Sequence, residues 1–119
     1  MSNGVWGLNR EPWIRDRFKC VYCGFDGAAS LLAVHQLTVD HIRSRQRDGT
    51  NDIENLATAC CACNGIKAEW DKRIYDPIAF GGKPAADVLD AAKKYIEDWY
   101  RLWDPGYQEM ITQATQACL

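Results

Sequence analysis

Four of the six cysteines in this chain form two Cys-x-x-Cys pairs, a spacing that suits the binding of a metal ion. Cys20 and Cys23 make the first pair, and Cys60 and Cys63 make the second, with 36 residues between the pairs. Each pair can present two thiolates to a tetrahedral ion, so together they predict a structural zinc site. The loop between them is about twice as long as in a compact zinc ribbon, which adds about 0.6 kcal/mol of loop entropy. Structural zinc supplies on the order of 10–16 kcal/mol, so the loop length does not oppose zinc.

Other interpretations of the cysteines are weaker. Redox-active pairs are the main competitor, but no thioredoxin-like pattern of strand, helix and strand surrounds either pair. Cys61 lies too close to Cys63 for both to chelate one ion easily, so we expect Cys61 to stay outside the site. Cys118 is expected to be a small apolar residue near a helix end.

A group of polar residues beside the cysteine pairs could hold a second metal ion and activate water. Asp40 and Asn64 offer oxygen ligands of the kind Mg²⁺ accepts, and this ion commonly takes one or two protein oxygens and keeps its waters. A histidine side chain titrates near neutrality, so His41 could take a proton from an attacking water. A carbonyl of Asn55 could hold that ring in one tautomer. Taken alone, Asn55 also suits a turn and Asn64 a helix N-cap.

Two strands and a helix are needed to bring these residues together. Residues 31–41 are β-rich and alternate in character, which predicts a strand that ends at Asp40-His41. His35 is expected to be a residue of this strand rather than a ligand. Residues 56–59 predict a short return strand, and residues 63–72 predict a helix.

Further helices are expected on both sides of this core. Residues 10–18 predict a short helix, and an apolar helical period from Ala85 predicts a longer one that ends at Asp104-Pro105-Gly106. A second amphipathic helix is expected over residues 107–118. The longer helix carries an aromatic stripe made of Tyr95, Trp99 and Trp103. Its spacing is typical of a surface that faces the core. If the stripe is exposed, it would suit a dimer interface.

Length and composition favour one ordinary globular domain. The chain has 119 residues, of which 47% are hydrophobic and 25% are charged, and these fractions exclude wholesale disorder. The formal net charge is −2, so any basic surface must be local. No apolar run approaches the roughly 18 residues of a membrane helix. No secretory signal is visible at the start, so we expect a cytoplasmic protein that does not contact a membrane.

Taken in order, four short motifs resemble the zinc-bearing branch of the HNH endonuclease family. They span roughly residues 18–70 and are Cys20-x2-Cys23, Asp40-His41-Ile42, Asn55-Leu56 and Cys60-x2-Cys63-Asn64-x2-Lys67. Their order and spacing are highly specific. The chain departs from the family pattern after Ile42, where Arg43-Ser44 replaces a common proline and a glycine pair is reduced to Gly49. These departures bear on the DNA contacts of the loop more than on the chemistry.

The resemblance implies an α+β fold. We expect a small ββα-metal hairpin and helix that carries the four-cysteine zinc site, with C-terminal helices packed on it. A single domain is expected over residues 1–119, with a motif core at 18–72 and a helical extension at 84–118.

The resemblance also implies roles for individual residues. Asp40 and Asn64 match ligands of the catalytic metal, His41 matches the general base, and Asn55 matches the residue that orients it. Lys67 matches a basic position that can touch phosphate. The DNA backbone is expected to be contacted by Arg43, Arg45 and Arg47, with a solvated loop as the alternative. The implied ions are a structural Zn²⁺ on the four paired cysteines and a catalytic Mg²⁺ or Mn²⁺.

The expected activity is metal-dependent hydrolysis of phosphodiester bonds in DNA. One such site cuts one strand per encounter, so a monomer is expected to nick duplex DNA with little sequence preference. A double break would need two events or a homodimer. The resemblance suits a bacterial or phage-type protein. The alternative is a zinc-ribbon module that binds DNA without catalytic activity.

Overall fold

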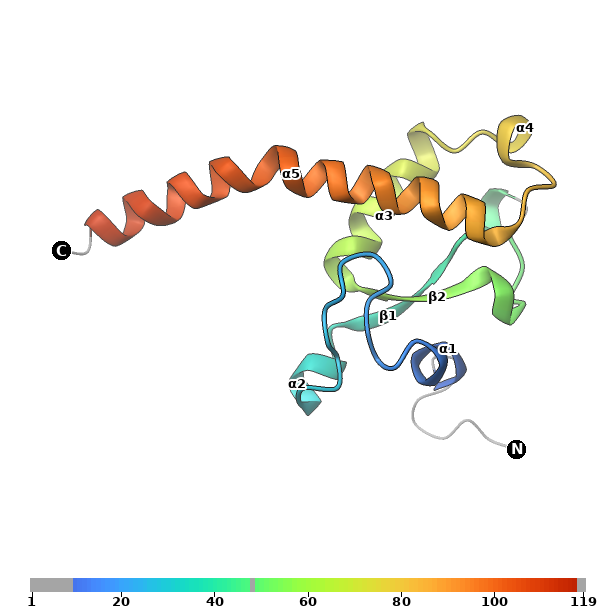
Figure 1. Cartoon of the computed structure of the whole chain (residues 1–119), viewed down its shortest axis with the longest axis horizontal. Helices are drawn as coiled ribbons and strands as arrows, with labels where there is room; N and C mark the ends of the chain where they lie inside the picture. Colours follow the sequence, from blue (N-terminus) through green and yellow to red (C-terminus); the bar gives the residue numbers. More distant parts are fainter. Residues whose placement is uncertain (1–9, 48, 118–119) are drawn as a thin grey trace.

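The computed structural model describes residues 10–47 and 49–117, and these have the mixed α+β architecture expected from the sequence. A two-stranded hairpin lies at the centre with helices on both sides of it (Figure 1). The expectation for Cys118 lies outside the described residues. None of the helices in this part of the chain combines the length and apolar character needed to cross a bilayer. In chain order the elements are α1 (Arg10–Arg15), α2 (Leu31–Val34), β1 (Leu37–His41), η2 (Arg45–Arg47), η3 (Ile53–Asn55), β2 (Leu56–Cys60), α3 (Cys61–Arg73), α4 (Pro77–Phe80) and α5 (Ala85–Ala117).

The central hairpin pairs β1 with β2 in antiparallel register, with Leu37 opposite Cys60 and His41 opposite Leu56. The return strand is confirmed, but the first strand is shorter than predicted. Residues 31–34 form α2 instead, because the Ser30 side chain accepts a hydrogen bond from the amide of Ala33 and caps the helix. Local capping therefore overrides the alternating pattern in this segment. His35 follows α2 as an exposed C-cap and is not part of the strand.

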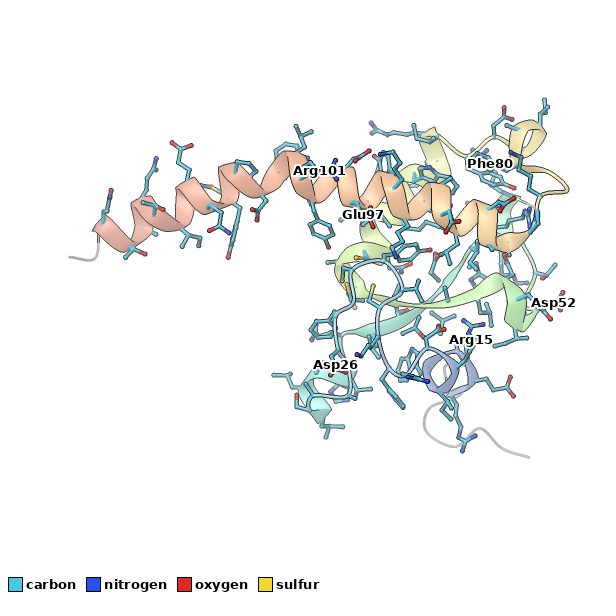
Figure 2. The ribbon with its side chains drawn as sticks, in the orientation of Figure 1. Arg15, Asp26, Asp52, Phe80, Glu97 and Arg101 are labelled. Carbon is cyan, nitrogen blue, oxygen red and sulfur yellow. The ribbon has the colours of Figure 1, made fainter. Side chains whose placement is uncertain are left out.

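An arginine and aspartate pair fastens α1 to the hairpin. Arg15 donates to the backbone carbonyls of Ile53 and Leu56, at 2.9 and 2.6 Å, and lies beside this end of the hairpin in Figure 2. Asp16 accepts hydrogen bonds from Arg15 and from the amide of Thr58. Burial alone would raise the pKa of Asp16, but these hydrogen bonds outweigh it and lower the pKa below its ordinary value.

The helix α3 packs across the hairpin and joins it to α5. Trp70 of α3 is 1% exposed, and its ring meets those of Tyr75 and Phe80 edge to face, with 5.7 Å between centroids in each case. From α5, the fully buried residues Val88 and Ile96 belong to the same hydrophobic cluster. The core that supports the strands is therefore shared between α3 and the first half of α5.

The C-terminal helix differs from the prediction. It runs without a break through Pro105, so the expected stop at residues 104–106 and the separate second helix were wrong. A proline removes one backbone donor and strains one turn, but it leaves the residues on either side free to remain helical. The first half of α5 packs on α3, whereas residues 101–116 are exposed and extend beyond the body (Figure 1). The expectation that the aromatic stripe faces the core fails at Trp103, which is 59% exposed.

Candidate metal centres and active site

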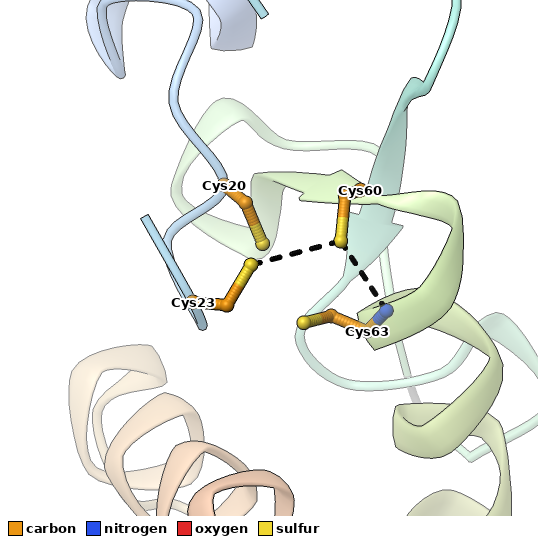
Figure 3. Close-up of side chains that lie close together, drawn as sticks. All are labelled: Cys20, Cys23, Cys60 and Cys63. Carbon is orange, nitrogen blue, oxygen red and sulfur yellow. Dashed lines mark hydrogen bonds between the residues drawn. The ribbon is translucent and has the colours of Figure 1, made fainter. Parts of the chain in front are cut away.

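The two cysteine pairs meet in one cluster at the end of β2. The four Sγ atoms of Cys20, Cys23, Cys60 and Cys63 all lie within 4.8 Å of one another, as Figure 3 shows. Sγ of Cys23 and Sγ of Cys60 are 3.7 Å apart, and tetrahedral zinc with bonds of about 2.3 Å places its sulfur ligands about 3.8 Å apart. Cys61 is exposed and lies outside the cluster, as expected. The geometry fits the predicted zinc site.

Local structure builds this cluster from both sides. Cys60 ends β2 and is the N-cap of α3, where its Sγ accepts a hydrogen bond from the amide of Cys63. On the other side, the amide of Val21 donates to the carbonyl of Thr58 at 3.0 Å and fixes the first pair against β2. The hydroxyl of Tyr100 on α5 lies 3.4 Å from Sγ of Cys63. Three separate segments therefore hold the sulfur atoms in place.

The short distances between the thiols couple their ionisation. A hydrogen bond from the Cys63 thiol lowers the pKa of Cys20 to about 4. The same hydrogen bond, together with burial, raises the pKa of Cys63 above its ordinary value. The protein alone thus tolerates one thiolate while a neighbour keeps its proton. A divalent cation is what allows thiols this close together to ionise, because its charge offsets their mutual repulsion.

A second polar site lies at the other end of β1. A cavity of about 400 Å³, which we call the Asp40 cavity, opens between β1, η2 and α3. Asn64 lies in the first turn of α3 and not at its N-cap, so its side chain belongs to the helix face that borders the cavity. The polar residues that line the cavity include Asp40, His41, Arg45, Arg47, Asn64 and Asp71.

Asp40 is held from beneath the cavity by two buried groups. It is 4% exposed, and its Oδ2 accepts a hydrogen bond from the Tyr22 hydroxyl at 2.5 Å. Its Oδ1 accepts from Nζ of Lys67 at 3.2 Å. A carboxylate has about four lone-pair positions, so both oxygens retain acceptor capacity toward a further ligand.

Lys67 does not lie where the resemblance implied. Its side chain is fully buried, and its ammonium group also donates to the carbonyl of His41 at 2.9 Å and to both carboxylate oxygens of Asp71, at 2.9 and 3.1 Å. A buried ammonium with these partners cannot reach a phosphate in solvent, so the expected phosphate contact was wrong. Lys67 instead links β1 to α3 beneath the Asp40 cavity.

Burial dominates the ionisation of both carboxyl groups in this network. It raises the pKa of Asp40, although the charge of Lys67 and the hydrogen bond from Tyr22 oppose that change. It also raises the pKa of Asp71, again against the charge of Lys67. Lys67 and Asp71 are four residues apart on one helix, and this spacing indicates a contact between them. No pattern in the sequence indicated that Tyr22 would contact Asp40.

The ring of His41 is held by a residue that the sequence did not single out. Nε2 of His41 lies 2.9 Å from Oδ1 of Asn51. An amide oxygen is an acceptor, so this contact places a proton on Nε2 and leaves the lone pair on Nδ1.

Asn55 has a different role from the predicted one. Its Oδ1 accepts from the amide of Arg43 at 2.8 Å, and its Nδ2 donates to the carbonyls of Arg43 and Thr50 at 3.0 and 2.8 Å. The expectation that Asn55 orients the ring directly was therefore wrong. Asn55 is 7% exposed and ties together both ends of the loop between the strands, and that loop carries Asn51 and the arginines.

The three arginines of this loop separate into two groups. Arg45 and Arg47 line the Asp40 cavity. Arg43 does not line the Asp40 cavity and instead donates through Nη2 to the carbonyls of Phe80 and Lys83. Gly49 closes the loop, because a Cβ there would overlap the carbonyl oxygen of Arg43. The loop is thus closed by backbone contacts that leave two arginines beside the cavity.

The donors at the Asp40 cavity fit a hard divalent cation. They are a carboxylate with spare acceptor capacity and the amide side chain of Asn64, and such oxygens suit Mg²⁺ or Mn²⁺ better than they suit soft ions. No thiolate lines this cavity among the residues described, which separates its chemistry from that of the cysteine cluster.

One comparison with known proteins identifies the core of the chain. The model of the HNH endonuclease family matches residues 20–69, the segment that holds both cysteine pairs, the hairpin and the first part of α3. Comparison with curated proteins and with solved structures finds no match. The two-stranded hairpin, the helix that follows it and the cysteine cluster agree with the family match. The core of the chain, residues 20–69, is therefore similar to an HNH endonuclease domain.

Proposed function

We propose that this protein is a metal-dependent DNA endonuclease that nicks duplex DNA with low sequence specificity. The observation that carries the proposal is the Asp40 cavity, where a carboxylate, an imidazole, an amide and two arginines border the same space. Hydrolysis of a phosphodiester needs a base for water, stabilisation of the developing charge and a grip on the backbone. These side chains supply each of the three.

The catalytic cation would be held by Asp40 and Asn64. When bound, Mg²⁺ or Mn²⁺ supplies stabilisation of the phosphoryl charge and of the leaving oxygen. Tyr22 and Lys67 fix the Asp40 carboxylate, so it does not have to reorganise to accept the ion. The positive charge of Lys67 opposes the burial that raises the pKa of Asp40 and so favours its ionised form.

His41 acts as the general base in this proposal. Oδ1 of Asn51 accepts a hydrogen bond from the protonated Nε2, which leaves Nδ1 to take a proton from water. Arg45 and Arg47 are the proposed phosphate contacts, because both border the cavity. Arg43 and Lys67 are excluded from this role by the contacts that they make within the protein.

We also propose that the protein works in a reducing compartment such as the cytoplasm. Sulfur atoms as close as those of Cys23 and Cys60, 3.7 Å apart, would form disulfides under oxidising conditions. A reducing setting keeps them available to zinc.

The two histidines of the chain provide the test. His41→Ala should lower the nicking rate of supercoiled plasmid by about 10²–10⁴-fold in Mg²⁺ or Mn²⁺, because the general base is lost. His35→Ala is the matched control, since His35 is the exposed C-cap of α2 and lies outside the Asp40 cavity. Zinc content and thermal melting should be unchanged in both variants. Undiminished cutting by His41→Ala would refute the base assignment.

A metal series separates the nuclease from the alternative function. Cutting should require Mg²⁺, Mn²⁺ or Ni²⁺ in addition to the bound zinc and should stop in EDTA. If the zinc-loaded protein binds plasmid but cuts it in none of these ions, the nuclease proposal is wrong and a DNA-binding zinc module remains.

A further inference from the structure

The second half of α5 presents an apolar face that nothing in the described part of the chain covers. Every residue from 101 to 116 is exposed, and beyond Arg101 the helix runs with no other element beside it in Figure 2. The exposed fractions of Trp103, Tyr107 and Met110 are 59, 54 and 63%. Single exposed apolar residues are ordinary, but a contiguous row of large ones marks an interaction surface.

This face continues the stripe that the first half of α5 buries. Val88, Ala92 and Ile96 are fully buried against α3, and Tyr100, one turn further on, reaches the cysteine cluster. From there the stripe follows the three-and-four spacing of a coiled-coil seam, with large residues at its flanks. The seam residues are Tyr100, Trp103, Tyr107, Met110 and Ala114, and the flanking residues are Trp99 and Ile111.

The sequence of this segment also argues against an isolated helix. A proline inside a helix costs about 3 kcal/mol and a glycine about 1 kcal/mol, and Pro105 and Gly106 lie next to each other here. Helices of this length without tertiary contacts are marginal in water even with good helix formers. The helical form therefore needs an apolar partner that offsets these costs.

We propose that the partner is a second copy of this chain, and that the two copies pair through the exposed face of α5 over residues 99–114. An apolar seam is complementary to itself, which is the condition for a two-fold interface. The area is also sufficient. Large side chains bury roughly 150–250 Å² each when fully covered, so the exposed parts of five such residues offer on the order of 600 Å² per copy. Two copies reach about 1,200 Å², the lower limit for a stable protein interface.

The charge of the segment favours a protein partner over a nucleic acid. The charged residues from 99 to 114 are Arg101, Asp104 and Glu109, and Arg101 is paired with Asp98 on the same helix at 2.8 Å, so the segment offers no free cluster of positive charge. A phosphate backbone or an anionic membrane would be repelled. In the heptad pattern Glu109 falls at a c position away from the seam, and Asp104 at an e position at its edge, so neither charge is placed within the apolar seam itself.

Sedimentation of the full zinc-loaded chain tests this proposal. Over about 1 to 300 µM the protein should pass from monomer to dimer, because a minimal interface gives an affinity in the micromolar range. The double variant Tyr107→Glu/Met110→Glu should weaken the dimer at least tenfold, since it places charge in the seam. Gln108→Glu/Thr112→Glu adds the same charge off the seam and should change the affinity by less than about twofold.

Assembly is measured here independently of cutting, so this inference and the proposed nuclease can fail separately. Zinc content should be unchanged in both double variants, because residues 107–112 do not touch the folded body. A wild-type chain that stays monomeric throughout would overturn the proposal. So would a dimer that the seam variant leaves intact, or one that the control weakens equally.

Discussion

Lys67→Met tests whether a buried ammonium holds the floor of the Asp40 cavity. Methionine keeps most of the volume of the side chain but removes the charge. The wild-type ammonium is fully buried and donates to Asp40, to Asp71 and to the carbonyl of His41. The variant leaves Asp40 with Tyr22 as its hydrogen-bond donor and leaves Asp71 without its ion-pair partner.

The size of the effect follows from this burial. Removing one partner of a buried ion pair costs about 3–5 kcal/mol, because the remaining charges are left uncompensated. Asp71→Asn in the same chain removes one of those charges, so the double variant should be less destabilised than the sum of the two single variants. The difference should be about 1–3 kcal/mol, the coupling energy usual for residues in one network.

The same helix contains a matched control. Glu69 and Arg73 are also four residues apart on α3, but their side chains are 47 and 75% exposed. Arg73→Met should therefore cost less than about 0.5 kcal/mol.

Urea unfolding of the zinc-loaded proteins, followed by far-ultraviolet circular dichroism, measures both effects. With a slope of about 1–3 kcal/mol/M, Lys67→Met should lower the midpoint by roughly 2 M. If Lys67→Met is as stable as Arg73→Met and instead weakens DNA binding, the structural role assigned to Lys67 is wrong and the phosphate contact is restored.

Three further predictions concern the zinc cluster and the loop. Cys20→Ser should lose zinc and unfold or aggregate, whereas Cys61→Ser should keep one zinc per chain by metal analysis; a stable, soluble Cys20→Ser protein would show that the zinc is not structural. Asn55→Ala should lower the free energy of unfolding by about 2–3 kcal/mol, because it removes three partly buried hydrogen bonds between the side chain and the backbone, and an unchanged melting temperature would contradict that role. Asn51→Ala should slow nicking by about 10- to 100-fold with little change in melting, since it frees the His41 ring at an exposed contact; a wild-type rate would remove Asn51 from the site.

Elements that depend on neighbouring residues were predicted correctly, whereas features that depend on contacts with distant residues were not. The return strand at residues 56–59 and the helix over residues 63–72 are confirmed, because both depend on patterns of neighbouring residues. The predicted end of the helix at Pro105 was wrong. A proline destabilises the helix locally, but it does not determine whether other contacts outweigh that cost.

The same distinction applies to the candidate site. The types and spacing of Asp40, His41 and Asn64 were sufficient to predict that they belong together, and all three border one cavity. The fates of Arg43 and Lys67 were not predictable, because each depends on partners far away in the chain. Arg43 meets carbonyls 37 and 40 residues away, and Lys67 meets Asp40 at a separation of 27 residues.

The sequence by itself determined which atoms are available: two pairs of thiols, a carboxylate beside an imidazole, and asparagines at fixed intervals. Metal-ligand chemistry depends strongly on residue type and spacing, so these could be recognised without coordinates. The tertiary structure alone decided which positive charges face solvent and which are buried, and which half of a long apolar helix finds a partner within the chain. Burial arises from the packing of distant segments, and the sequence pattern of a charged or apolar residue is the same whether or not another segment covers it.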